Sequence, residues 1–306
     1  MLVPAGMTEF AKDKTFGYKA SDLGDWCEEK TEGAYKAGEM IYIGLSDLRA
    51  CNYDGIVRQL LSASNFNKVI VNAVDYSDVK VFAITLVRAL ALGKEFIIRS
   101  AAAVTKILGG ISDRPLLTRE ELVEEGNRSG GIIVVGSHVN KTTLQLRALE
   151  ECPYPIQFIE FNQHLVLQEG GLEGEVKRVD AIIEKAIREG VTVAVYTRRD
   201  RFDLDSGDKE KQLLVSVKIS DAVTDIIGKL TVRPSFIIAK GGITSSDIGT
   251  KALHVRRATV MGQIMPGIPV WMTDENSKFP RMPYIIFPGN VGETETLREM
   301  VEKLIS

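Results

Sequence analysis

The sequence contains little cysteine, and this scarcity limits where the protein can work. Cys27, Cys51 and Cys152 are its three cysteines among 306 residues, and none belongs to a CxxC pair. A scattered, odd-numbered set builds no disulfide framework and fits a reducing compartment. The first residues, MLVPAGMTEFAKDK, also lack the basic start and apolar core of a signal peptide. We therefore expect a cytoplasmic protein.

Long hydrophobic runs and an excess of one charge are also missing. No apolar run approaches the roughly 20 residues that a transmembrane helix needs. The net charge of -3 supplies no overall field that would attract nucleic acid or anionic lipid, so we expect neither nucleic acid nor membrane as a partner. The three histidines show no metal-ligand spacing, and we expect no metal site built by the protein alone.

What is present is an ordinary globular composition with alternating strand and helix patterns. The chain is 44% hydrophobic and 26% charged, and its 306 residues suggest two domains with sizeable cores. Short apolar runs alternate with segments of helical period, which favours right-handed crossovers and parallel sheets. We predict an α/β fold class, with two domains of mainly parallel sheet and a Rossmann-like three-layer architecture. The predicted strands of the first half are residues 40–44, 68–71 and 95–100.

A break in this pattern at residues 109–131 marks the expected domain boundary. The segment contains Asp113-Arg114-Pro115, an acidic run and several glycines, which are typical of a linker. We accordingly place a first domain at residues 1–115 and a second at residues 128–306.

Four predicted strands of the second half end in residues suited to ligand binding. In open α/β sheets, ligands bind outside the carboxyl ends of the strands, so we expect these ends to converge on one edge. They are Gly136-Ser137-His138, Thr197-Arg198, Gly241-Gly242-Ile243-Thr244 and Gly289-Asn290-Val291-Gly292.

Residues 236–250, FIIAKGGITSSDIGT, carry the clearest chemical pattern. The pattern predicts a buried strand that stops at a tight turn and leads into a helix. Glycine lets a ligand approach the backbone closely, and a helix N-terminus binds anions such as phosphate. We interpret Gly241–Thr244 as a phosphate cradle, with a plain packing turn as the alternative. No GxGxxG motif opens any strand–helix unit, which argues against a dinucleotide-dependent oxidoreductase.

Other polar side chains have two interpretations each. His138 is either a general base or a loop histidine bonded to backbone, and we favour the second. Arg198 and Arg199 form either a phosphate clamp or a pair of solvated charges. Asp75, after the predicted strand 68–71, is a candidate catalytic base, although we favour a helix N-cap.

Taken in order, these motifs resemble one known family. The resemblance rests on KGGITSSD, VVGSHVNKTTLQL, VYTRR and FPGNVG in the second half, and on TEFAKDKTFGY, VIVNAVDYSDV and FIIRSAAAV in the first. These stretches resemble the four-carbon acid sugar kinases, ATP-dependent kinases of threonate- or erythronate-like sugar acids. The resemblance implies a sugar-acid-binding first domain and a second domain that binds ATP with Mg²⁺. Position by position, it implies nucleotide contacts at Ser137, Gly241, Gly242, Ile243, Thr244, Gly289, Asn290 and Gly292.

The sequence departs from the family pattern in two ways. Full-length members begin with a further stretch that includes an Asp-Asp-x-Thr-Gly loop, which we expect to supply substrate contacts and the acid–base carboxylate. This sequence has no such motif, so we expect a partial, N-terminally truncated sugar-acid domain with no assigned catalytic residue. Ile243 stands where many relatives carry Asp or Glu, and any task of that carboxylate is vacant.

Two functions follow from this comparison. The first is an ATP-dependent kinase of a four-carbon sugar acid, with Asn72 and Arg99 meeting the substrate carboxylate and hydroxyls. The alternative is a non-catalytic nucleotide-binding relative, or one fragment of a split kinase that needs a missing N-terminal partner segment. Exposed apolar surface on an incomplete first domain would favour a homo-oligomer.

Overall fold

The chain divides into two compact units, Met1–Asp113 and Arg114–Ser306, which are described separately. The computed structural model describes residues 3–12, 17–200, 202, 204 and 209–306. Part of the TEFAKDKTFGY stretch, residues 13–16, therefore lies outside the described residues.

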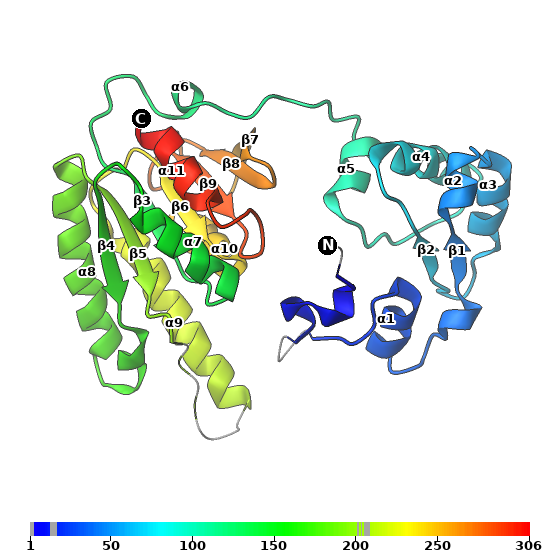
Figure 1. Cartoon of the computed structure of the whole chain (residues 1–306), viewed down its shortest axis with the longest axis horizontal. Coiled ribbons are helices and arrows are strands. Elements are labelled where there is room, and N and C mark those ends of the chain that lie inside the picture. The colour runs from blue at the N-terminus through cyan, green and yellow to red at the C-terminus, as the bar shows by residue number, and fades with distance from the viewer. Residues whose placement is uncertain (1–2, 13–16, 201, 203, 205–208) are drawn as a thin grey trace. The chain divides into compact units, whose positions relative to one another are not determined.

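The second unit is built on one sheet of seven strands (Figure 1). Five strands at one side run parallel, and two antiparallel strands complete the sheet. In spatial order they are β4 (Ile156–Phe161), β5 (Thr192–Thr197), β3 (Ile132–Val135), β6 (Ile237–Lys240), β9 (Pro283–Phe287), β8 (Ile268–Thr273) and β7 (Ala258–Met265). All residues of β3 and β6 are buried, as expected for central strands covered on both faces.

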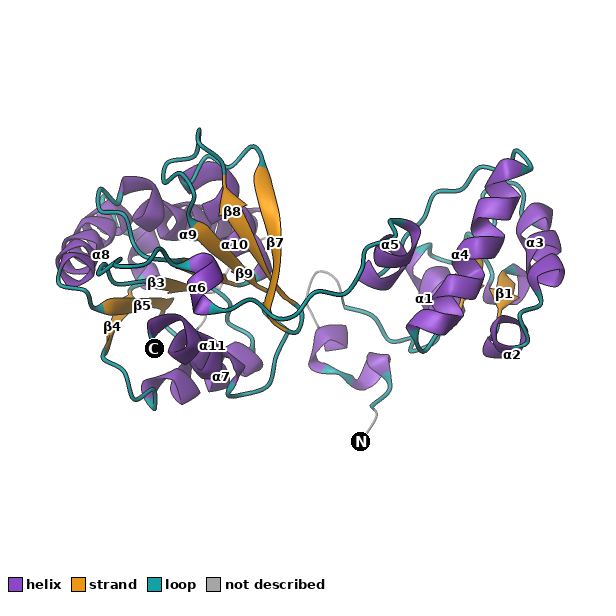
Figure 2. Cartoon of the chain, turned by 90° about the horizontal axis from the view of Figure 1, so that it is seen from above, coloured by secondary structure: helices purple, strands orange, loops and turns teal. Residues whose placement is uncertain are grey.

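Helices cover both faces of this sheet and create two hydrophobic cores. Figure 2 shows α8 (Gly171–Arg188) and α9 (Lys209–Lys229) on one face, and α7 (Asn140–Glu150) and α11 (Thr296–Ile305) on the other. The first core contains Val134 and Ala239 with Val179 and Ile226. The second core lies on the opposite face, because successive residues of a strand point to opposite sides. These three layers confirm the predicted α/β class.

Shorter elements complete the second unit. They are α6 (Arg119–Leu122), η4 (Gln163–Leu167), α10 (Gly242–Asp247) and the π-helical turn η5 (Ile248–Ala252). Since Asp247 and Ile248 both have α-helical backbone angles, α10 continues directly into η5.

The first unit contains a much smaller sheet. Its two strands, β1 (Ile41–Ile43) and β2 (Val69–Val71), are parallel and pair Ile41 with Val69. Its core joins these strands to α2 (Leu45–Arg49), α3 (Tyr53–Ser62) and α4 (Tyr76–Ala91). The remaining elements are η1 (Ala5–Met7), η2 (Glu9–Lys12), α1 (Leu23–Lys30), η3 (Ala37–Glu39) and α5 (Ala102–Leu108).

The strand predicted at residues 95–100 is wrong, because this segment has no regular secondary structure. Its apolar residues suggested burial, but Ile97 is 93% exposed and Ile98 is 47% exposed, while Phe96 alone packs beside the core. A strand needs a hydrogen-bonding neighbour, and in this unit β2 pairs with β1. Among the described residues no strand pairs with this segment, and the sequence pattern alone could not predict that.

None of the helices in the described ranges is long and apolar enough to cross a membrane.

Tyr284 links the sheet to the segment that follows β6, and its substitution tests the packing there. The side chain is fully buried, and its hydroxyl donates a hydrogen bond of 2.5 Å to the carbonyl oxygen of Ser245. Replacement by Phe removes one buried hydrogen bond, so we expect Tyr284→Phe to lower the free energy of unfolding by about 1 kcal/mol. Urea unfolding measures this, with Tyr154→Phe as the matched control. A loss no larger than that of the control would contradict the assignment.

Candidate phosphate-binding site at the carboxyl edge of the sheet

The two central strands of the large sheet, β3 and β6, are neighbours, and the connections that follow them lead to opposite sides of the sheet. After β3 the chain passes through α7 to β4 on one side of the sheet, and after β6 it reaches β9 on the other. The following helices also lie on opposite faces, since Leu146 of α7 belongs to one core and Ile248 of η5 to the other. This arrangement is the topological switch point at which open α/β sheets bind ligands.

Three loops meet closely at this switch point. A Cβ atom built on Gly136, after β3, would lie 2.2 Å from the Thr244 hydroxyl oxygen. One built on Gly289, after β9, would lie 3.2 Å from the Ser137 hydroxyl oxygen, and one on Gly241 would lie 3.3 Å from the Ser137 Cβ. Distances under 3.0 Å essentially never occur for real Cβ atoms, so a side chain at position 136 would have to displace the Thr244 side chain.

The turn after β6 has the conformation that the sequence predicted. Gly241 adopts φ +126°, which an L side chain rarely tolerates, and α10 begins at Gly242. The first backbone N–H group with a partner in this helix is that of Ser245, which donates to the Gly241 carbonyl oxygen. The N–H groups of Gly242, Ile243 and Thr244 thus remain available at the helix start. A Cβ at Gly242 would meet nothing within 4 Å, so this side of the turn is open.

Three basic side chains contact these loops, and none forms an ion pair with a carboxylate of the described residues. Lys240 donates to the carbonyl oxygens of Pro288 and Gly289 at 3.0 and 3.4 Å. Lys141 donates to the Gly292 carbonyl oxygen at 3.1 Å. Arg199 is the third, and its partners are also uncharged. A set of positive charges without acids favours an anionic ligand.

Arg199 holds the loop after β3 from the side of β5. Its Nη2 atom donates to the Ser137 carbonyl oxygen at 2.6 Å and to the Thr143 hydroxyl at 3.0 Å. Its Nη1 atom is buried and has no hydrogen-bond partner among the described residues. Burial lowers the pKa of the Arg199 guanidinium from its ordinary value, and the side chain nevertheless remains charged in proteins.

The nucleotide contacts implied by the resemblance fall into two groups. Ser137, Gly241, Thr244 and Gly289 meet at the switch point, and Gly242 and Ile243 lie exposed at the start of α10 beside them. The other two, Asn290 and Gly292, belong to the loop between β9 and α11. Asn290 is exposed, and Gly292 has φ +80°.

Two further residues, which the sequence did not predict, support these loops. Thr142 is fully buried and donates from its hydroxyl to Ser137 Oγ at 3.2 Å. Gln145, also fully buried, donates to the carbonyl oxygens of Val291 and Glu293 at 3.1 and 2.8 Å. Both are ordinary polar positions in an amphipathic helix, so nothing in the sequence distinguishes them. Lys240 was also missed, although a lysine that ends an otherwise apolar strand was a usable signal.

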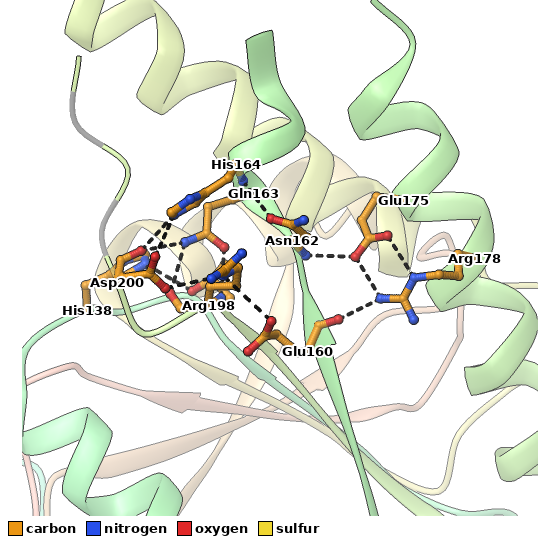
Figure 3. A network of polar contacts seen from close by, with 10 residues as sticks. His138, Glu160, Asn162, Gln163, His164, Glu175, Arg178, Arg198 and Asp200 are labelled. Atoms are coloured by element: carbon orange, nitrogen blue, oxygen red, sulfur yellow. Dashed lines mark hydrogen bonds and ion pairs between the residues drawn. The ribbon is translucent and has the colours of Figure 1, made fainter. Parts of the chain in front are cut away.

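The neighbouring strand ends, at β4 and β5, form a separate network of paired charges (Figure 3). Arg198 lies 3.3 Å from Asp200 Oδ1 and 3.8 Å from Glu160 Oε1. His138 Nε2 lies 3.2 Å from the Arg198 carbonyl oxygen and 3.3 Å from the Thr197 hydroxyl. The ring therefore contacts backbone, as the favoured interpretation of this histidine predicted.

A groove of about 400 Å³ beside β4 and α8 extends this network, but its charges are satisfied internally. Arg178 donates to both carboxylate oxygens of Glu175 and to the Glu160 carbonyl oxygen, as Figure 3 shows. The Asn162 N–H also donates to Glu175, and the Arg178 hydrogen bonds hold the pKa of this carboxyl below its usual range. The cradle loops are therefore a better candidate for a ligand site than the groove.

The candidates of the first unit have structural partners. Asp75 is the N-cap of α4: its carboxylate accepts from the N–H groups of Ser77 and Asp78 at 2.7 and 3.1 Å. The Asp78 carboxylate in turn accepts a hydrogen bond from the Asp75 N–H, which completes a capping box. Arg99 stacks over the Trp26 ring at 4.7 Å, and the backbone N–H of Asn72 donates a hydrogen bond to the Ile43 carbonyl oxygen. These contacts support the helix-cap interpretation and leave the substrate roles of Asn72 and Arg99 as hypotheses.

Comparison with protein families gives two matches that follow one another along the chain. A sugar-binding N-terminal domain matches residues 1–108, and a nucleotide-binding C-terminal domain matches residues 132–297. A search of curated proteins found no match to the sequence.

Comparison with solved structures gives distant neighbours. A protein from Salmonella typhimurium LT2, provisionally called a tRNA synthase, shares 14% identity at a TM-score of 0.59, over 96% of this chain and 66% of its own. A Bordetella bronchiseptica domain of unknown function, a citrate-bound, domain-swapped dimer, shares 14% identity at a TM-score of 0.42, over 97% of this chain and 65% of its own. At such identity the first likeness concerns the fold alone. The chain spans about two thirds of the length of these proteins.

Substitution of two cradle glycines tests the close approach of the loops. Gly136→Ala should place a methyl group against Thr244, so we expect it to lower the free energy of unfolding by about 1 to 3 kcal/mol. Gly242→Ala meets open space and should not destabilise the protein. Urea unfolding of both variants measures the difference. If the two variants were equally stable, the loops would not be packed as described.

The cap assignment of Asp75 predicts a change in stability. Asp75→Ala leaves two N–H groups at the start of α4 without acceptors, and we expect it to destabilise the first unit by about 1 kcal/mol. Asp54→Ala, which removes a 90% exposed carboxylate from the first turn of α3, is the control and should have a smaller effect. Hydrogen exchange of the α4 amides reports on this unit directly. Unchanged protection of α4 in Asp75→Ala would count against the cap.

Proposed function

The chain belongs to the four-carbon acid sugar kinase family, and from this premise we propose that it is an ATP-dependent kinase of a four-carbon sugar acid of the threonate or erythronate type. The observation that carries the nucleotide half of the proposal is the meeting of the loops after β3, β6 and β9 at the switch point. Glycine at position 136 leaves the space that the Thr244 side chain occupies. The sugar-binding match over the first unit supports the acceptor half.

The cradle suits a polyphosphate in three respects. The N–H groups at the start of α10 are directed away from the helix, as phosphate oxygens require. The Thr244 hydroxyl, between Gly136 and Gly241, adds a donor from a side chain. Beside the loops, Lys141 and Arg199 supply positive charge, Lys240 can add a third charge when it is protonated, and no acid of the described residues pairs with any of the three. Phosphoryl transfer depends mainly on such positioning and charge stabilisation.

The residues do not fit a magnesium site held by the protein. Within the described residues, no three potential ligands among His, Cys, Asp and Glu cluster around a common point. Ile243 offers no ligand, and Asp247 is already bonded to Ser220 and Lys251 at 3.0 and 3.2 Å. In our proposal Mg²⁺ arrives bound to the nucleotide phosphates, and we derive no step from a metal coordinated by this chain.

The acceptor half of the proposal rests on fewer contacts. Arg99 and Asn72 are proposed to meet the carboxylate and hydroxyls of the sugar acid, because Arg donors match carboxylate geometry. The Asp75 carboxylate is occupied by the helix cap, which makes it a poor base for the acceptor hydroxyl. This observation favours a second candidate function, a nucleotide-binding protein that does not transfer phosphate alone, or one part of a split kinase.

Thermal unfolding with and without Mg-ATP tests the nucleotide site. A ligand that binds only the folded state at a hundredfold excess over its Kd stabilises it by about 2.7 kcal/mol, so we expect ATP but not NAD to raise Tm. Gly242→Val should abolish this shift, because its side chain enters the open side of the turn. Gly174→Val, which also meets open space but lies in α8, should keep the shift.

Turnover then separates the two candidate functions. Release of ADP that depends on threonate or erythronate would support the kinase. Binding of ATP without any turnover would support the binding protein or the split kinase. If millimolar ATP leaves Tm unchanged, the cradle is an ordinary turn and the proposal fails.

A further inference from the structure

Lys240 is the least expected charge in the described part of the second unit. It ends β6 between β3 and β9, and its side chain is fully buried. The Nζ atom lies 3.8 Å from the centre of the Phe287 ring and contacts two backbone carbonyl oxygens of the next loop. A lysine is almost never fully buried unless it is paired, and this one has no acid among the described residues. Such a position calls for a functional explanation.

The contacts of Lys240 orient the loop after β9. In a planar trans peptide the N–H group points opposite to the carbonyl of the same peptide unit. Since the Pro288 and Gly289 carbonyl oxygens point toward Nζ, the N–H groups of Gly289 and Asn290 point away from it. Neither N–H donates to an acceptor in the described part of the chain. Gly289 also lies against Ser137 and Gly241, so these two donors belong to the cradle.

We propose that Lys240 is a positioning residue of the nucleotide site, which holds the Pro288–Gly289 turn in place and takes up one proton from solvent when a polyphosphate binds. This inference rests on the proposed nucleotide-binding function. No bond other than N–H changes: the neutral amine becomes an ammonium, and the proton comes from the buffer. The neutral amine retains two N–H groups, so both carbonyl contacts are possible in either state.

The surroundings of Lys240 explain why a ligand would change its protonation. Burial, with a smaller contribution from the nearby ammonium of Lys141, lowers the pKa of Lys240 to about 7. Lys141, from α7, is the charged group that faces it; its neighbours on β3 and β9, Val135 and Phe287, are uncharged. A bound polyphosphate brings negative charge to this dry region and favours the ammonium. Binding should therefore be accompanied by proton uptake between pH 7 and the higher pKa of the bound state.

Calorimetry of Mg-ATP binding at pH 8, in two buffers with different ionisation enthalpies, tests the inference. For the wild type we expect heats that depend on the buffer and correspond to uptake of a large part of one proton. The affinity should fall as pH rises from 7 to 9, by up to about tenfold per pH unit, since one proton is bound. A purely structural role for Lys240 would leave the heats independent of the buffer.

Two variants complete the test. Lys240→Met keeps the length of the side chain and should lose the proton uptake, with affinity reduced on the order of tenfold. Lys218→Met removes an exposed lysine of α9 and should behave like the wild type. ATP binding whose heat is independent of the buffer in the wild type, or uptake retained in Lys240→Met, overturns the inference but leaves the nucleotide site intact. Absence of any ATP binding by the wild type would instead refute the proposed function.

Discussion

The second unit depends on the pairing of β3 with β6 at the centre of its sheet. This pairing places Val135 opposite Lys240, so the two loops that follow begin side by side. The Gly136 N–H donates to the Lys240 carbonyl oxygen at 3.3 Å, and the Gly241 N–H donates to the Phe287 carbonyl oxygen at 2.9 Å. Parallel pairing thus continues past the strands into the cradle. The cradle loops therefore begin as an extension of the sheet ladder.

Backbone N–H groups and basic side chains lie on different sides of the cradle loops. The N–H groups face the proposed ligand, and the basic side chains bond to carbonyl oxygens on the opposite side. Arg199 on the Ser137 carbonyl and Lys240 on the Pro288 carbonyl have the same effect, because each fixes the peptide that follows. Neither side chain contacts a carboxylate of the described residues, which would cancel the field of a positive charge there.

Local patterns predicted the second unit well and the first unit less completely. The Gly241 turn and the buried strand that precedes it were confirmed, because each depends on residues close in sequence. The strand expected at residues 95–100 was wrong, since strand formation depends on a distant neighbour that the segment itself does not encode. Thr142 and Gln145 were missed for the same reason: their importance comes from loops about 150 residues away that only the fold brings near.

The two halves of the proposed reaction therefore differ in how the sequence encodes them. The cradle is assembled from three strand–loop units of a single sheet, each recognisable by its glycines. The acceptor candidates of the first unit, Asn72 and Arg99, lie in irregular segments, where Asn72 contacts backbone and Arg99 contacts an indole ring. A binding site made from the ladder of a sheet survives changes of surface residues, whereas one made from exposed side chains can be altered by single substitutions. In the proposed reaction, nucleotide binding would therefore depend on the fold, whereas the choice of sugar acid would depend on exposed side chains.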